Sequence, residues 1–341
     1  MGADATEVVG LYGDPDATWS IAVDLGLLAA VRPEDLEERA AAMVAAHLHL
    51  GPTPEVLVSD VEDERQAAVV QAYRPGDPLV RLVLAPDGRR LLVAAHHGAV
   101  DGLGLLGVAR TVLDLDLRCG ARGIGDRSSP TGFLLSSVRR VGEALLAPPL
   151  RFGGDGSPAE VGEHVTAREL PPTRRGTAAL ATSVLAAHRR LHPGARGRAV
   201  LAVGASRRTD PRPRPDRQTA YLRLRLPPGT PGEQVAAALA TVPPEPDFPE
   251  TSAGGLGPLA TRALRGRLGA TATLSNLGSV EGQLRSVAMY PALNGPRAVG
   301  VGLASTALTM TLTLRTRRSD LDRAGHDRLL ALIVDELLRD Q

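Results

Sequence analysis

The segment Arg90–Gly107, RLLVAAHHGAVDGLGLLG, constrains this chain more than any other. Its first part, Leu91–Ala95, is a short apolar run between turn residues, which is typical of a buried strand. Apolar residues then recur from Leu103 to Leu113 at roughly helical spacing, which predicts a helix. The turn between strand and helix therefore presents two histidines and an aspartate at the edge of a core.

The two histidines, His96 and His97, are neighbours in the chain. Since successive strand side chains leave on opposite faces, both cannot face one cavity while the strand stays regular. One is expected to be structural and the other to be available for chemistry. A histidine pair that binds one metal sits at i, i+2 on a strand or i, i+4 on a helix. We therefore predict no bound metal.

The glycines that open the predicted helix form a competing motif. Gly102–Gly107 reads G-x-G-x-x-G, the fingerprint of dinucleotide-binding folds. In those folds the first glycine follows the strand directly, whereas here HHGAVD intervenes. A second apolar strand with a ribose-binding carboxylate is also missing about 20 residues further on. Close packing of the helix is the favoured interpretation of these glycines.

Composition narrows the chemistry further. All 39 basic residues are arginine, and the lack of lysine excludes a Walker phosphate loop, a pyridoxal Schiff base and a Ser-Lys dyad. The net charge of +1 gives no global field that would require nucleic acid or an anionic membrane as partner. The only cysteine, Cys119, cannot form an internal disulfide, and an incidental thiol is favoured over a nucleophile.

Length and hydropathy bound the organisation. A chain of 341 residues with 43 % hydrophobic residues can form two ordinary domains or one large two-lobed unit. The Pro- and Gly-rich stretch 147–172 is where a boundary is expected. The N-terminus lacks the basic and apolar segments of a signal peptide, and no run of about 18 apolar residues occurs. We therefore predict a soluble cytoplasmic protein.

The residues 96–102, HHGAVDG, match the pattern HHxxxDG. In this segment the chain resembles the superfamily of chloramphenicol acetyltransferases, the condensation domains of nonribosomal peptide synthetases and related acyltransferases. The resemblance includes residues 78–93, which look like the paired strands that lead into the motif, and, more weakly, the phrase Ser275-Asn276-Leu277-Gly278. Members usually run longer than this chain, which leaves carrier-docking surfaces and the shape of the substrate tunnel open.

The resemblance implies an α+β fold. Two chloramphenicol-acetyltransferase-like lobes, mixed sheets with flanking helices, would form a pseudo-dimer around a central channel. We place the N-terminal lobe, which carries the motif, at residues 1–155 and the C-terminal lobe at residues 156–341. The second lobe would supply the surface that simpler relatives obtain from a neighbouring subunit, so we expect a monomer.

The resemblance also implies roles for the motif residues. His97 would be the general base, and His96 would pack behind it. Histidine suits this role because its ordinary pKa, about 6.5, lets it accept a proton at neutral pH. Asp101 would be a structural acid that turns inward to an arginine, with Arg207 and Arg208 as candidate partners, since a buried carboxylate must be paired.

Donors for a tetrahedral oxyanion are a separate requirement of acyl transfer. Backbone N–H groups near Gly102 and the side chains of Ser275 and Asn276 are candidates. The alternative interpretation is that the two side chains are only a polar strand cap.

Two function classes remain open. The first is an acyltransferase or stand-alone condensation enzyme of secondary metabolism. It would transfer an acyl group from a coenzyme A or carrier-protein phosphopantetheine thioester to an amine or hydroxyl, with no tightly bound cofactor. Its partners would be a small-molecule acceptor and an acyl or peptidyl carrier protein. The second is a non-catalytic, condensation-domain-like module that binds a carrier protein or small ligand, because function lives in sites rather than folds. The intact motif favours the first class.

Overall fold

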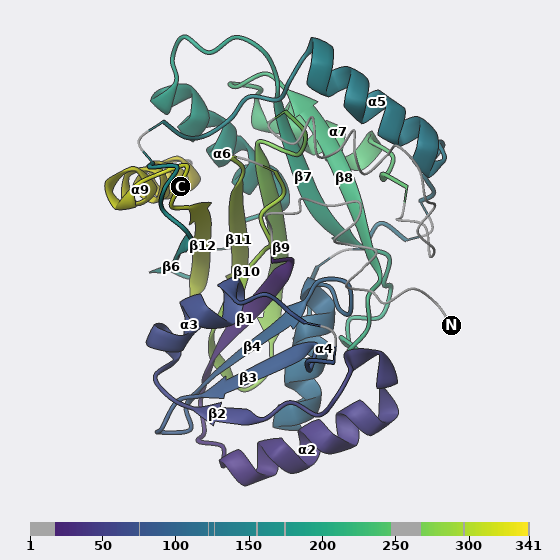
Figure 1. The fold of residues 1–341 in the computed structure, drawn as a ribbon, viewed down its shortest axis with the longest axis vertical. Helices are drawn as coiled ribbons and strands as arrows, with labels where there is room; N and C mark the ends of the chain where they lie inside the picture. Colours follow the sequence, from purple (N-terminus) through teal and green to yellow (C-terminus); the bar gives the residue numbers. More distant parts are fainter. Residues whose placement is uncertain are drawn as a thin grey trace.

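The computed structural model describes residues 18–339 apart from 75, 122, 126, 155, 174, 247–266 and 296. This part of the chain forms two mixed sheets with flanking helices (Figure 1). The five-stranded sheet has the order β10-β1-β4-β3-β2, and the seven-stranded sheet has the order β6-β12-β11-β9-β7-β8, with β5 paired to β9. In Figure 1 the helices α2 and α4 lie below with the first sheet, and α5, α6 and α7 lie above with the second.

The first sheet is covered on both faces. The helices α2 (Pro33–Ala46) and α4 (Gly102–Leu113) belong to the core on one face, and α3 (Val61–Val70) belongs to the smaller core on the other. Every residue of β4 after Arg90 is buried, as the apolar run of the sequence predicts. The remaining elements of this lobe are β1 (Ser20–Leu27), β2 (Val56–Val58), β3 (Val80–Leu84), β4 (Arg90–His96), β10 (Leu284–Tyr290) and the short helix η1 (Leu48–Leu50).

The second sheet carries its own core. Its inward-facing strand residues pack against α6 (Thr177–Leu191), α7 (Gly232–Thr241) and α9 (Arg323–Leu338). The central strands pair in parallel while the outer pairs are antiparallel, so the sheet is mixed. Its strands are β5 (Arg118–Cys119), β6 (Glu163–Leu170), β7 (Ala199–Ser206), β8 (Thr219–Leu226), β9 (Ala272–Glu281), β11 (Val299–Ser305) and β12 (Met310–Arg317).

Aspartates begin three of the helices. The side chains of Asp60, Asp101 and Asp322 accept hydrogen bonds from backbone N–H groups in the first turns of α3, α4 and α9. These contacts satisfy donors that have no partner inside a helix. The helix α2 begins instead with Pro33 and an acidic first turn, both of which favour a helix start.

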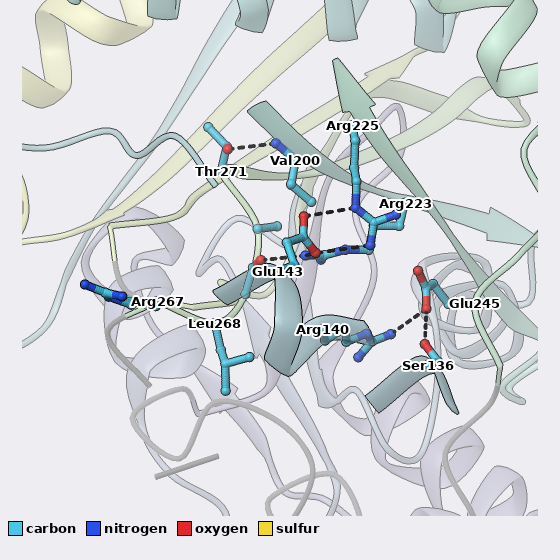
Figure 2. Close-up of polar contacts among 12 residues, drawn as sticks. Ser136, Arg140, Glu143, Val200, Arg223, Arg225, Glu245, Arg267, Leu268 and Thr271 are labelled. Atoms are coloured by element: carbon cyan, nitrogen blue, oxygen red, sulfur yellow. Dashed lines mark hydrogen bonds and ion pairs between the residues drawn. The ribbon is translucent and has the colours of Figure 1, made fainter. Parts of the chain in front are cut away.

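The helix α5 (Phe133–Leu146) is held against β8 by its polar side. Glu143 pairs with Arg223 (Oε2 to Nη2, 2.8 Å) and with Arg225 (Oε1 to Nε, 2.9 Å), as Figure 2 shows. Ser136 and Arg140 of the same helix both donate to Glu245 (2.6 and 3.1 Å). These contacts fix the face of β8 that carries Arg223 and Arg225.

A strand of the second half completes the first sheet. β10 pairs antiparallel with β1, with Ala22 opposite Tyr290, although it follows β9 in the sequence. The architecture is α+β with two lobes, as predicted from the sequence. The division at residue 155/156 stays a prediction, since residue 155 lies outside the described residues.

Candidate active site

The end of β4 sends the two histidines into different surroundings. His96, the last residue of β4, is buried; its Nδ1 accepts from the backbone N–H of Gly98 (3.1 Å), and its ring meets Tyr73 edge-on at 5.4 Å. The backbone N–H of His97 donates to the carbonyl oxygen of Trp19 (2.7 Å), which continues the pairing of β4 with β1 by one residue. The His97 ring, in contrast, contacts Val100 and Tyr221.

The hydrogen bonds of the His97 ring fix its tautomer. Nδ1 lies 3.0 Å from the carbonyl oxygen of Val100. Since a carbonyl oxygen can only accept, Nδ1 carries the hydrogen and Nε2 keeps its lone pair. Burial lowers the pKa of His97, which favours the neutral imidazole that a general base requires.

A tyrosine of the other lobe reaches the second ring nitrogen. The hydroxyl of Tyr221, on β8, hydrogen-bonds to Nε2 of His97. Burial raises the pKa of Tyr221, so its hydroxyl stays protonated and donates to the His97 lone pair. Tyr221 was not among the residues predicted from the sequence. Its only signal there is a place in the alternating strand of β8, on the side opposite Leu222 and Leu224.

Asp101 is engaged from three directions. Its Oδ1 accepts from the backbone N–H of Gly104 (2.7 Å) and from Nη1 of Arg208 (2.8 Å), and its Oδ2 accepts from the backbone N–H of Gln218 (2.7 Å). Both side chains of the ion pair are at most 5 % exposed. With these partners the carboxylate holds α4 and the β7–β8 loop together, and its three hydrogen bonds go to groups other than the His97 ring.

The two arginines named from the sequence take different places. Arg208 joins Asp101 to Asp216, and it also donates to the Asp216 carbonyl oxygen (2.7 Å). Arg207 instead donates to the carbonyl oxygen of Arg127 (3.0 Å). Arg208 is therefore the arginine that forms the ion pair with Asp101.

The glycine-rich start of α4 serves the same loop. A Cβ at Gly104 would collide with the backbone carbonyl of Asp216, and a Cβ at Gly107 would collide with the backbone of Arg214. Glycine therefore allows the helix to approach the β7–β8 loop directly. Close packing, the interpretation favoured from the sequence, accounts for the G-x-G-x-x-G pattern.

The two candidate oxyanion donors on β9, Ser275 and Asn276, point to opposite sides. Ser275 lies beside the motif, because a Cβ at Gly102 would be 3.6 Å from its Oγ. Asn276 points to the second lobe, where its Nδ2 donates to the carbonyl oxygen of Arg175 (3.3 Å) and contacts Thr177 Oγ1 (3.4 Å). Ser275 is the better placed of the two for contact with a molecule at His97.

Other sequence candidates lie away from this chemistry. Burial raises the pKa of Cys119 to about 11, and its thiol donates to the carbonyl oxygen of Leu277 (2.7 Å), so it is not a thiolate nucleophile. Among the residues described, no three His, Cys, Asp or Glu side chains group closely enough to hold a metal ion. Within the same residues no helix has the length and apolar character needed to cross a membrane.

A hollow of about 770 Å³ lies elsewhere on the protein. It is lined by residues of both sheets, including Asp24, Arg90 and Glu169, and by none of the motif residues. Four of its charged side chains, Asp24, Glu62, Arg65 and Arg90, pair with one another, as in the contact of Arg90 Nη2 with Asp24 Oδ2 (2.6 Å). This hollow is therefore not the channel predicted at His97.

Comparison with known proteins gives the fold class. No family model and no curated protein matches the sequence. The first condensation domain of the calcium-dependent antibiotic synthetase, solved with a substrate analogue, is similar at a TM-score of 0.61 and 15 % identity, over 99 % of this chain and 96 % of that one. A variant of the starter condensation domain of rhizomide synthetase, in complex with C8-CoA and Leu-SNAC, is similar at 0.59 and 16 %, over 99 % and 93 %.

An epimerization domain has the same architecture. The domain from the third module of tyrocidine synthetase B is similar at a TM-score of 0.54 and 13 % identity, over 94 % of this chain and 91 % of that one. The chain therefore has the fold of the condensation and epimerization domains of peptide synthetases. The two-lobed, chloramphenicol-acetyltransferase-like fold implied by the HHxxxDG residues is confirmed. Sequence identities of 13 to 16 % show that the fold is shared and do not show that the activity is shared.

Proposed function

We propose that the protein is an acyltransferase or stand-alone condensation enzyme that moves an acyl group from a thioester to an amine or hydroxyl. The observation that carries this proposal is the state of His97. Burial lowers the pKa of His97 and so favours its neutral ring, its Nδ1–H is fixed on Val100, and its Nε2 lone pair points toward the second lobe. That arrangement is what a general base for an incoming nucleophile needs.

The other residues take supporting roles in the proposal. Asp101 and Arg208 hold the start of α4 against the β7–β8 loop, which positions Gly102. The backbone near Gly102 and the hydroxyl of Ser275 would donate to the oxyanion of the tetrahedral intermediate. His96 packs behind the reacting face.

The thioester donor is either acyl-coenzyme A or an acylated carrier-protein arm. The rhizomide synthetase relative was solved with C8-CoA, which supports testing a coenzyme A thioester first. The proposal also includes four further features. These are a channel that passes His97, a division into lobes at residue 155/156, a monomeric state and a cytoplasmic location.

One observation favours a second candidate function. The Nε2 lone pair of His97 already has a partner in Tyr221. If that hydrogen bond closes the site permanently, the protein would be a non-catalytic module that binds a carrier protein or small ligand.

A donor screen separates the two functions. The purified chain is incubated with acyl-coenzyme A and acylated carrier donors, each with amine and hydroxyl acceptors, and free thiol and product are scored by mass spectrometry. The enzyme proposal predicts thiol release that depends on His97. Binding of a donor without thiol release above the His97→Ala background would support the binding module instead.

A further inference from the structure

We propose that Tyr221 is part of the base: protons pass between the incoming nucleophile and His97 through the Tyr221 hydroxyl. This inference rests on the function proposed above and adds a second catalytic residue from the other lobe. It starts from the hydrogen bond between Tyr221 and Nε2 of His97, which leaves that nitrogen no lone pair for a substrate.

The Tyr221 hydroxyl can serve both partners at once. A phenol donates one hydrogen and also accepts. Here the hydrogen points to His97, since Nδ1 holds the ring hydrogen on Val100. The lone pairs of the Tyr221 oxygen can then accept a hydrogen bond from an amine or hydroxyl. Burial raises the pKa of Tyr221, so the residue relays a proton and does not ionise.

The approach beside Tyr221 is open among the described residues. Gly204 of β7 pairs with Tyr221 of β8, and directly paired residues place their side chains on the same face. A Cβ at Gly204 would meet only the carbonyl oxygen of Leu274, at 3.7 Å. The described residues therefore leave room for at least a methyl-sized group at this position next to the tyrosine.

The strand that carries Tyr221 is anchored. Two and four residues further along β8, Arg223 and Arg225 are both paired with Glu143 of α5 (Figure 2). The backbone oxygen of Tyr221 accepts from the N–H of Glu245 (2.7 Å). These contacts anchor the strand that carries Tyr221, and an anchored strand helps to keep its hydroxyl near His97, as a proton relay requires.

The atoms of the step balance. The nucleophile bonds to the thioester carbon as its proton passes to Tyr221 Oη, the Tyr221 proton passes to His97 Nε2, and the carbonyl electron pair moves to oxygen. When the intermediate collapses, the C=O bond forms again and the C–S bond breaks. The departing thiolate takes the proton back from the imidazolium through the same hydroxyl, so the products are the acylated acceptor and a free thiol.

The test compares single-turnover rates of four proteins with whichever thioester proves active: wild type, Tyr221→Phe, His97→Ala and the double variant. The relay predicts that Tyr221→Phe lowers the rate about 10²-fold, the lower end for a proton-transfer group. The double variant should be no slower than His97→Ala, because the two residues act as one unit. The matched control is Tyr73→Phe, which removes a hydroxyl near His96 and is expected to keep the wild-type rate.

A second measurement reports the contact itself. Imidazole titration by nitrogen NMR should give a higher His97 pKa in Tyr221→Phe than in wild type, because the hydroxyl donates to the neutral ring. Gly204→Val should slow turnover at least 10-fold while leaving this titration unchanged.

The outcomes separate the relay from the function on which it rests. A wild-type protein that turns over no thioester overturns both. Turnover that is lost in His97→Ala but kept in Tyr221→Phe overturns the relay alone, and a faster Tyr221→Phe variant would show that the tyrosine blocks the site. Additive losses in the double variant would also contradict a shared proton path.

Discussion

The two sides of the sheet at the end of β4 use the same kinds of residue for different purposes. On the His96 side a tyrosine, Tyr73, packs against the ring, and Arg315 donates to the carbonyl oxygen of Ser20, the residue paired with His96. On the His97 side a tyrosine bonds to the ring, and Arg208 pairs with the motif aspartate.

The two sides differ in whether a hydrogen-bonding position remains available to another molecule. Arg315 is 1 % exposed; it pairs with Glu163 (2.8 Å) and also donates to the carbonyl oxygens of Ser20, Pro291 and Val69. Every direction around that guanidinium is used for structure. On the other side, the Tyr221 hydroxyl keeps an acceptor position beside the open space at Gly204. The comparison indicates that one side fixes the strand, while the other keeps a hydrogen-bond acceptor that the proposed reaction can use.

Replacing Arg315 by methionine is expected to have the largest effect on stability. The change leaves Glu163 buried and unpaired, and breaking such a pair costs about 3 to 5 kcal/mol. Chemical denaturation would measure the free energy of unfolding, with Arg32→Met as the control, because the Arg32–Asp35 pair is exposed and contributes little. If both variants unfold at the same denaturant concentration, the contacts of Arg315 do not stabilise the fold.

Asp101→Ala is expected to have the second largest effect on stability. It removes the α4 cap and the partner of Arg208, at a cost of about 2 to 4 kcal/mol. Arg208 keeps Asp216, which makes this loss smaller than that of Arg315. Thermal denaturation should show it, while the folded fraction keeps more activity than His97→Ala. Wild-type stability with vanished activity would instead make Asp101 catalytic.

His96→Ala should cost less again, about 1 to 3 kcal/mol of stability, through lost packing on Tyr73 and a lost hydrogen bond from Gly98. Its effect should couple with that of Arg315→Met and add to that of Asp101→Ala, since the first pair shares one side of the sheet. Double-variant unfolding measures this coupling. A rate loss in His96→Ala equal to that in His97→Ala would mean that both histidines serve the reaction.

The smallest effect is in the pH profile. Since burial lowers the pKa of His97, the ring is protonated, and lost as a base, only at a pH below the ordinary histidine range. The value of kcat/KM should therefore stay level as the pH falls to about 6.5 and decline below it. An acid limb above that range would show a His97 that is more basic in the protein than in water.

The sequence predicted the elements nearest the motif. The apolar run and helical spacing of residues 91–113 gave β4 and α4 because these signals are local. The opposite directions of His96 and His97 follow from strand geometry alone. The resemblance to HHxxxDG proteins implied that Asp101 pairs with an arginine, and the cost of burying an unpaired charge explains why that carboxylate needs a partner.

Contacts between the lobes could not be read in the same way. Tyr221 lies 124 residues from His97, and no local pattern reports that β8 brings its hydroxyl to that nitrogen. The return of β10 to the first sheet is also a long-range pairing. Asn276 was named as a binding residue beside Ser275, yet strand alternation sends its amide to Arg175 on the other side.

The most direct test of the central claim is the single-turnover rate of His97→Ala beside wild type, at equal melting temperature, with an active thioester donor. If His97 is the base, the rate should fall by about 10² to 10⁴ while the fold stays intact. A His97→Ala variant that releases thiol at the wild-type rate would contradict the account.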